Sequence, residues 1–324
     1  DFRRRYPDDS LIAAANTMLL ANYEQLGQWH AAAAVLDAIH AAQQDPDLKR
    51  ESLYLAAGYY DRSGDRQNAI SRYRRYAHQW PEPGLDRMEA MNRLAALYQL
   101  EQEPQKRRFW LDKMVAAQEA SAWGNSDREL YLVAWASAEL AEQAYLAFVG
   151  IDLDYPLKAS LQRKRRAMDK TLEAYRRTGD YGIQRFTTLA TCRIGQVYPR
   201  LAADLMKSER PGTIDALALE QYELLLEEQA FPFEEKAIAI HQAHSRRSWE
   251  GIYDHWVGRS FQELASLQPA RYRRTEIITG AREFDTGLPE VVADFADEEA
   301  MAQALSEAEY WFRENRRRAP DKLA

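Results

Sequence analysis

The stretch Leu53–Pro81 constrains the fold of this chain more than any other. It holds small residues where two helices would touch, large aromatic residues beside them, a turn glycine and a terminal proline: Ala57, Ala69, Tyr60, Tyr73, Gly64 and Pro81. Small residues permit close helix approach, aromatic rings fill the neighbouring space, and glycine and proline favour a turn and a helix end. The stretch therefore predicts an antiparallel helix pair.

Imperfect copies of this stretch lie on both sides of it. The upstream copy has the same order and spacing, except that Leu20 replaces the small residue: Leu20, Tyr23, Gly27, Trp29, Ala32 and Leu36. Downstream, Ala95, Tyr98 and Leu111 match, whereas Gln102 replaces the turn glycine and Pro104 follows it. Tyr23, Tyr60 and Tyr98 are 37 and 38 residues apart. This period predicts an array of helix pairs with short insertions at 43–47 and 82–86.

This pattern resembles the tetratricopeptide (TPR) repeat over roughly residues 1–115. Scarce glycine and proline, with abundant alanine, leucine, glutamate and arginine, favour helix throughout. We expect an all-α, TPR-like α-solenoid of antiparallel helix pairs. Its expected parts are repeats at 1–120, degenerate TPR-like repeats at 121–270 and a charged segment at 271–324 with an amphipathic helix near 298–317. Tyr6-Pro7 has the phase of Trp80-Pro81, which predicts a truncated first repeat in a fragment of a longer protein.

The later part of the chain has its own expected elements. Helices are predicted at 126–148 and 157–177, the second basic on one face, and the repeat logic resumes at Ile194–Tyr198. Thr213 is a candidate N-cap for the next helix. Pro232 is expected to break that helix and form a hydrophobic corner at Phe231–Lys236. A long helix is then expected over roughly 234–267.

No chemical motif points to catalysis or to a cofactor, so we do not expect an enzyme. His241 and His244 form the one spacing that could hold a metal, but His255 lies three turns farther along the expected helix. We therefore favour ordinary surface or partly buried histidines over a metal-dependent enzyme. The single Cys192 is expected to be a buried thiol. A net charge of −7 argues against nucleic acid as a partner, and no apolar run is long enough to span a membrane.

The TPR resemblance implies that the first helix of each pair lines a partner groove. The residues expected there are Thr17, Ala21, Glu24, Tyr54, Gly58, Asp61, Arg62, Asn92, Arg93, Ala96 and Gln99. Relatives that capture a C-terminal carboxylate use Lys and Asn at such positions, and here Asn92, Arg62 and Arg93 come closest. We expect a mixed groove that accepts an extended or helical peptide of a protein partner.

A second resemblance covers roughly residues 160–272. The segments Leu219–His241, Gly251–Leu264 and Pro269–Tyr272 are similar to large TPR proteins of Gram-negative envelopes, encoded beside TonB/Tol-type proton-driven motor components. It implies a non-enzymatic periplasmic scaffold for transport or motility, with a partner site at Phe231, Pro232, Phe233, Glu234 and Glu235. The alternatives are a cytoplasmic location and a peptidoglycan- or glycan-binding protein that uses exposed Trp and Tyr side chains. Partner identity and oligomeric state stay open.

Overall fold

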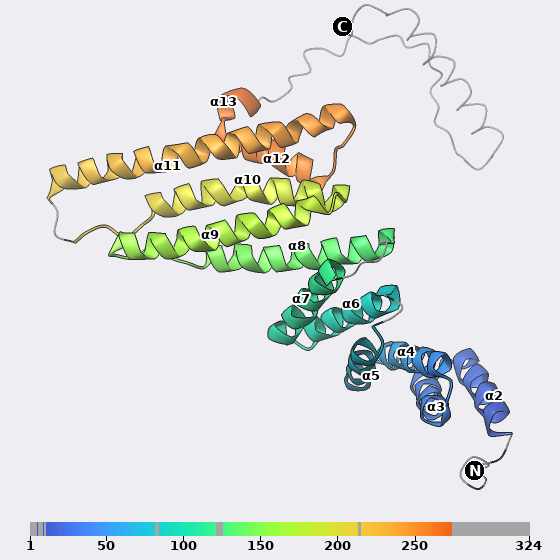
Figure 1. Cartoon of the computed structure of the whole chain (residues 1–324). Helices are drawn as coiled ribbons and strands as arrows, with labels where there is room; N and C mark the ends of the chain where they lie inside the picture. The colour runs from blue at the N-terminus through green and yellow to red at the C-terminus, as the bar shows by residue number, and fades with distance from the viewer. Residues whose placement is uncertain are drawn as a thin grey trace, which may run out of the picture. The chain divides into compact units, whose positions relative to one another are not determined.

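The computed structural model describes residues 11–81, 84–120, 126–212 and 215–273, together with Arg5 and Asp9. These residues form helices and connecting turns without a strand, which confirms the all-α class (Figure 1). The described residues all belong to one compact unit. The helix expected near 298–317 and the Tyr6-Pro7 pair lie outside the described residues, as does Thr213.

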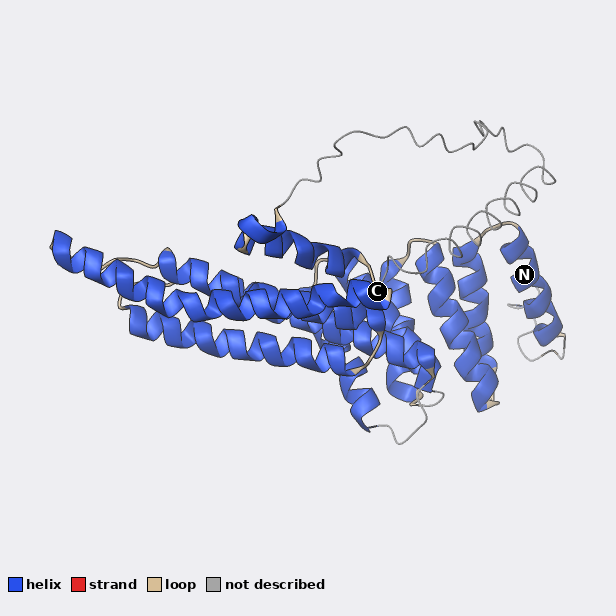
Figure 2. Ribbon diagram, turned by 90° about the horizontal axis from the view of Figure 1, so that it is seen from above, coloured by secondary structure: helices blue, strands red, loops and turns tan. Residues whose placement is uncertain are grey.

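Helices adjacent in the chain pack on one another. The shorter helices are α2 (Ile12–Gln25), α3 (Trp29–Ala42), α4 (Pro46–Arg62), α5 (Arg66–Gln79), α6 (Gly84–Leu100) and α7 (Pro104–Ala120). The longer ones are α8 (Asp127–Val149), α9 (Leu157–Asp180), α10 (Gln184–Met206) and α11 (Ala216–Ser245), and α12 (His255–Leu267) and α13 (Pro269–Tyr272) follow them. The long helices α8, α9, α10 and α11 lie side by side in chain order (Figures 1 and 2). The fold is a TPR-like array of helix pairs, as predicted.

The repeat phase is confirmed by three turns with the same geometry. Gly27, Gly64 and Gln102 have left-handed φ values of 64°, 80° and 56°. In each turn the next residue donates its N–H to the carbonyl of the repeat tyrosine, Tyr23, Tyr60 or Tyr98, at 2.8, 3.0 and 2.9 Å. This is the hydrogen bond that commonly satisfies a helix C-terminus. Gln102 therefore accepts a conformation that glycine adopts at no steric cost.

The predicted pair at 53–81 forms α4 and α5, and local capping explains its ends. Asp45 accepts hydrogen bonds from Asp47 N and Leu48 N at the start of α4, where Pro46 takes the first helical position. Asp65 accepts from Asn68 N at 3.1 Å and starts α5 directly after the Gly64 turn. The short connection makes α4 and α5 antiparallel neighbours.

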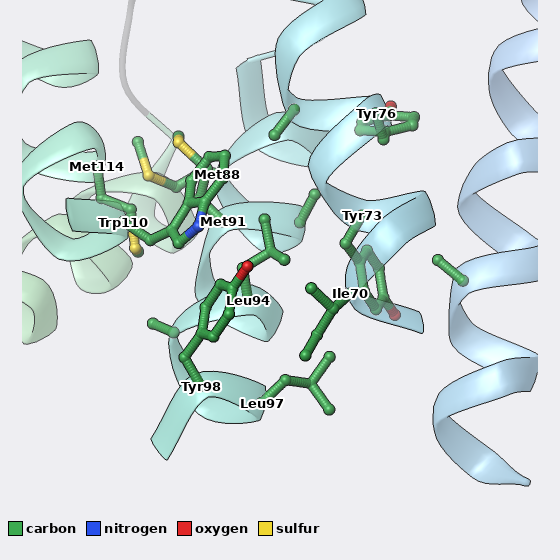
Figure 3. Packing of buried hydrophobic residues seen from close by; sticks show 14 of the residues in the cluster. Ile70, Tyr73, Tyr76, Met88, Met91, Leu94, Leu97, Tyr98, Trp110 and Met114 are labelled. Atoms are coloured by element: carbon green, nitrogen blue, oxygen red, sulfur yellow. The ribbon is translucent and has the colours of Figure 1, made fainter. Parts of the chain in front are cut away.

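The core follows the small-residue seam. Ala57 and Ala69 are fully buried, as are the equivalent Ala95 of α6 and Ala32 of α3. Larger side chains fill the remaining space; Figure 3 shows Ile70, Tyr73, Tyr76, Met88, Met91, Leu94, Leu97, Tyr98, Trp110 and Met114 packed together. This cluster continues from α3 into α8, so successive helix pairs share one apolar core.

A partly buried network of side-chain hydrogen bonds links three helices. Arg72 of α5 donates from Nε and Nη2 to the two carboxylate oxygens of Asp37 on α3, at 3.2 and 2.8 Å. The hydroxyl of Tyr60 on α4 donates to the same carboxylate at 2.8 Å. Burial, reinforced by this hydrogen bond, raises the pKa of Tyr60 to about 12. A bidentate arginine–carboxylate pair adds geometric specificity, so the network fixes how α3, α4 and α5 pack.

The loop between α8 and α9 is held by a fully buried cation. Lys164 Nζ lies 2.6 Å from a carboxylate oxygen of Asp204 on α10. It also donates to the carbonyl oxygens of Ile151 and Phe148, at 2.5 and 3.2 Å. A buried ammonium is tolerated when it is paired and hydrogen-bonded in this way. Lys164 therefore joins α9, α10 and the loop that begins at Gly150.

Two expectations about the last helices are wrong. α11 runs unbroken through Pro232, so Phe231–Lys236 is the middle of a helix and not a corner. Proline removes one helical hydrogen bond and introduces a steric clash. Here α11 packs on α10, with Phe233 against the cluster that includes Val197 and Leu201, and Leu226, Ala230 and Ala237 are buried on the same face. This packing offsets the local loss.

The expected helix over 234–267 is instead two helices with a 3₁₀ turn, Arg246–Glu250, between them. Gly251 follows the turn with a left-handed φ of 81°, and Asp254 caps α12 by accepting from Trp256 N and Val257 N. α11 itself is capped by Asp215, which accepts from Ala218 N at 2.8 Å. Within the described ranges, every helix is too short or too polar to cross a bilayer.

Candidate partner-binding site

A hollow of about 480 Å³ opens between α4, α5 and α6. Its walls are Tyr54, Leu55, Gly58, Tyr59, Asp61, Arg62, Tyr73 and Arg93, and we call it the α4 hollow. Most of these residues come from one face of α4, because positions three and four apart are neighbours on a helix. Tyr73 of α5 and Arg93 of α6 complete it. Five residues expected in the groove thus come together: Tyr54, Gly58, Asp61, Arg62 and Arg93.

Arg62 is held in place by aromatic rings. Its guanidinium carbon lies 5.1 Å from the ring centre of Trp29 and 5.8 Å from that of Tyr59. Tyr59 is itself fixed by a hydrogen bond from its hydroxyl to Glu24. Burial, together with this bond, raises the pKa of Tyr59 to about 12. Stacking orients the guanidinium without neutralising it, so Arg62 presents a fixed positive charge.

Arg93 supplies a second positive charge from the neighbouring repeat. Its charge lowers the pKa of Tyr54, although burial and the carboxylates of Glu89 and Asp86 outweigh it and raise that pKa overall. Glu89 forms an ion pair with Arg128, whose Nε lies 2.6 Å from Glu89 Oε1. Among the described residues, neither Arg62 nor Arg93 forms an ion pair with a carboxylate. Both guanidinium groups can therefore bind a carboxylate of a ligand.

The Tyr73 side chain lines the hollow and contributes a protonated hydroxyl group. Burial raises the pKa of Tyr73, so its hydroxyl remains a hydrogen-bond donor at neutral pH. That hydroxyl lies 3.6 Å from the position a Cβ on Gly58 would occupy. Gly58 has no side chain to separate this hydroxyl from the hollow, which both residues line. The hollow thus combines two cations, one carboxylate at Asp61 and hydroxyl donors.

The other residues expected in the groove lie elsewhere. Thr17 donates back to the carbonyl of Ala13 at 3.1 Å, and Glu24 acts through Tyr59. Asn92, Gln99, Ala21 and Ala96 do not line the hollow. Conversely, Leu55, Tyr59 and Tyr73 line it and were not predicted. Leu55, Tyr59 and Arg62 are spaced i, i+4 and i+7, a helical stripe that could have identified the first two.

The second expected partner site does not have the expected shape, because Pro232 lies within α11. Phe231 is 59% exposed, and Glu234 and Glu235 are also at the surface. Phe233 instead packs on the cluster that includes Val197 and Leu201 of α10. Phe231, Pro232, Glu234 and Glu235 are thus exposed on a continuous helix while Phe233 faces inward, and partner binding at this segment stays a prediction.

His241 and His244 are buried, which corrects the expectation of surface or partly buried side chains. Their Nδ1 atoms lie 2.9 and 2.8 Å from the same hydroxyl oxygen, Ser260 Oγ of α12. Burial lowers both pKa values, that of His244 to about 4. Within the described residues no group of three His, Cys, Asp or Glu side chains is arranged to hold a metal. The pair links α11 to α12. Cys192 is buried, as predicted.

The comparisons with known proteins add a fold similarity. A scan against protein-family models and a search of curated proteins gave no match. Among solved structures, the chain is similar to the nearly identical TPR-like repeats of a protein described as a kinesin light chain from Podosopora anserina. The identity is 16%, the match covers 69% of this chain and 94% of that chain, and the TM-score is 0.34.

Proposed function

We propose that the chain is a non-enzymatic scaffold that binds an acidic peptide segment of a protein partner in the α4 hollow. The observation that carries the proposal is the pair of arginines, Arg62 and Arg93, with no carboxylate partner among the described residues. Arginine forks bind carboxylates through paired, charge-assisted hydrogen bonds. Aromatic walls and the exposed Leu55 would hold the apolar parts of the same segment. Stacked helix pairs commonly serve this kind of recognition.

A selection from a random peptide library against the full chain tests this proposal. Asp- and Glu-rich peptides should be recovered, and their affinity should fall about 100-fold for Arg62→Glu/Arg93→Glu, since two attractive contacts become repulsive. Arg176→Glu/Arg177→Glu on the exposed face of α9 is the matched control, with the same change in charge. If the affinity falls equally in both variants, or in neither, the peptides do not bind in the α4 hollow.

We propose a periplasmic location in a Gram-negative envelope, with TonB/Tol-type motor components as partners in transport or motility. The support is the resemblance of residues 160–272, which is independent of the hollow. A pull-down of the full chain with those components should succeed and should fail for Arg62→Glu/Arg93→Glu. Undiminished binding by the variant would contradict binding in the α4 hollow. Recovery of the protein in the cytoplasmic fraction of cells would contradict the periplasmic location.

One observation favours cell-wall glycan as a second candidate ligand. Trp249 on the 3₁₀ turn is 90% exposed and Tyr253 nearby is 68% exposed. Exposed aromatic faces can stack on the apolar faces of sugar rings. Co-sedimentation with purified peptidoglycan, lost in Trp249→Ala and retained in Arg62→Glu/Arg93→Glu, would support this candidate. A soluble fraction that contains all of the wild-type chain would exclude it.

A further inference from the structure

α11 carries a row of exposed apolar side chains. Leu217, Leu224 and Phe231 are 66%, 56% and 59% exposed and are spaced seven residues apart. Seven residues are close to two turns of helix, so the three side chains share one face. The row extends about 21 Å, at 1.5 Å per residue, which is enough to contact several turns of another helix. We call it the α11 apolar row.

The row points away from the core of its own unit. Leu226, Ala230 and Ala237 are buried on the same face of α11 as Phe233, which packs on the cluster that includes Val197 and Leu201 of α10. Leu224 lies two residues from Leu226, about 200° around the helix, and therefore on the opposite side. α12 packs farther along α11, where His241 and His244 contact Ser260. Among the described residues, the row has no helix packed over it.

The flanks of the row are acidic. Between residues 216 and 235 the chain has six glutamates and no Lys, Arg or His: Glu220, Glu223, Glu227, Glu228, Glu234 and Glu235. Glu223 lies 3.6 Å from Arg210 Nε, and within the described residues the other five have no ion-pair partner. Charges beside a helical contact row select partners of opposite sign.

We propose that the α11 apolar row docks an amphipathic helix of a partner protein, with apolar residues at heptad spacing and Lys or Arg beside them. A second copy of this chain does not offer this combination. Its own α11 apolar row would bring glutamates against glutamates. Its basic α9 face carries none of the large apolar side chains that are exposed elsewhere in the described unit. The apolar row would supply contact area and the glutamates orientation.

The probe is a synthetic helical peptide of three heptads, about 21 residues. Each heptad has Leu at positions a and d, which form the contact row, and Lys at positions e and g beside that row. A second peptide has Glu in place of Lys. Binding to the full chain is measured by fluorescence anisotropy at low and high salt. Leu224→Ala/Phe231→Ala removes the row without changing charge, and Leu100→Ala/Leu146→Ala, 60% and 61% exposed on α6 and α8, is the matched control.

We expect the basic peptide to bind and the acidic peptide not to bind. Affinity should fall about tenfold or more in Leu224→Ala/Phe231→Ala and stay within about twofold in the control. Glu227→Gln/Glu228→Gln should reduce the salt dependence of binding. Equal loss in the two alanine variants, or binding of both peptides, overturns the proposal.

Two other occupants have distinct outcomes that would also overturn the proposal. If the full chain sediments as a dimer and Leu224→Ala/Phe231→Ala as a monomer, a second copy covers the row. If a thiol introduced by Leu224→Cys in the full chain resists a water-soluble maleimide, another part of the chain covers it. A monomeric chain with a rapidly labelled thiol agrees with an open row.

Discussion

Gly195→Ala should destabilise the packing of α10 on α11, whereas Gly58→Ala should not destabilise α4. Both glycines lie within helices. A Cβ on Gly195 would lie 2.6 Å from the Cε1 and Nε2 atoms of His241. A Cβ on Gly58 would have its nearest neighbour, the Tyr73 hydroxyl, at 3.6 Å. The distance at Gly195 is about 1 Å shorter than a normal van der Waals contact and is therefore a clash. The distance at Gly58 is a normal contact distance.

The expected magnitudes follow from two opposing effects. Replacing a helical glycine with alanine stabilises a helix by about 1 kcal/mol at either site. At Gly195 the added methyl group also overpacks a closed interior, which costs about 1–3 kcal/mol. His241 cannot move aside freely, because it is fully buried and its Nδ1 is bonded to Ser260. The two variants should therefore differ in unfolding free energy by about 1–3 kcal/mol.

Native-state hydrogen exchange is the suitable assay, since helix arrays can open locally. Protection of α10 and α11 amides should fall in Gly195→Ala, and protection of α4 amides should be unchanged or higher in Gly58→Ala. In a His241→Ala background the methyl group has space, so Gly195→Ala should become neutral or stabilising. If Gly195→Ala stabilises the wild-type chain as much as Gly58→Ala does, the close approach of His241 to α10 is wrong.

Three further stability predictions follow from the same contacts. Ser260→Ala should cost about 1–3 kcal/mol, because two buried imidazoles lose their Nδ1 partner, whereas Ser248→Ala should change the urea midpoint little. Burial lowers the folded pKa of His244 to about 4, so the unfolded state takes up its proton first. Stability should therefore fall as pH drops from about 6.5 toward 4, by at most roughly 3 kcal/mol, and a titration of His244→Gln should show a shallower decline. Tyr60→Phe should lower the unfolding free energy by about 1 kcal/mol through loss of its bond to Asp37, and an unchanged value would exclude a role for that bond.

Local chemistry explains why much of the fold could be predicted from the sequence. A turn glycine and a small-residue seam act within one helix pair, so Gly64, Ala57 and Ala69 were sufficient to locate α4 and α5. The same period identified Gln102 as the equivalent of Gly64, and its left-handed backbone confirms that phase. These signals need no information about distant residues.

Features that depend on packing could not be predicted in the same way. Pro232 is a helix breaker by propensity, and only the contacts of α11 with α10 explain why the helix continues through it. The membership of the α4 hollow depends on which side chains of α5 and α6 meet α4, which put Tyr73 in and left Asn92 out. The burial of His241 similarly requires α12 to fold back on α11 after the Gly251 turn.

Binding of a protein partner in the α4 hollow is tested most directly by site-specific photo-crosslinking of the full chain with a selected acidic peptide. One photoreactive group is placed at Leu55, which lines the hollow, and another at Leu100, which is exposed elsewhere on α6. We predict crosslinks from position 55 that disappear in Arg62→Glu/Arg93→Glu, and none from position 100. Crosslinks from position 100 alone, or crosslinks from 55 that persist in the variant, would contradict binding in the α4 hollow.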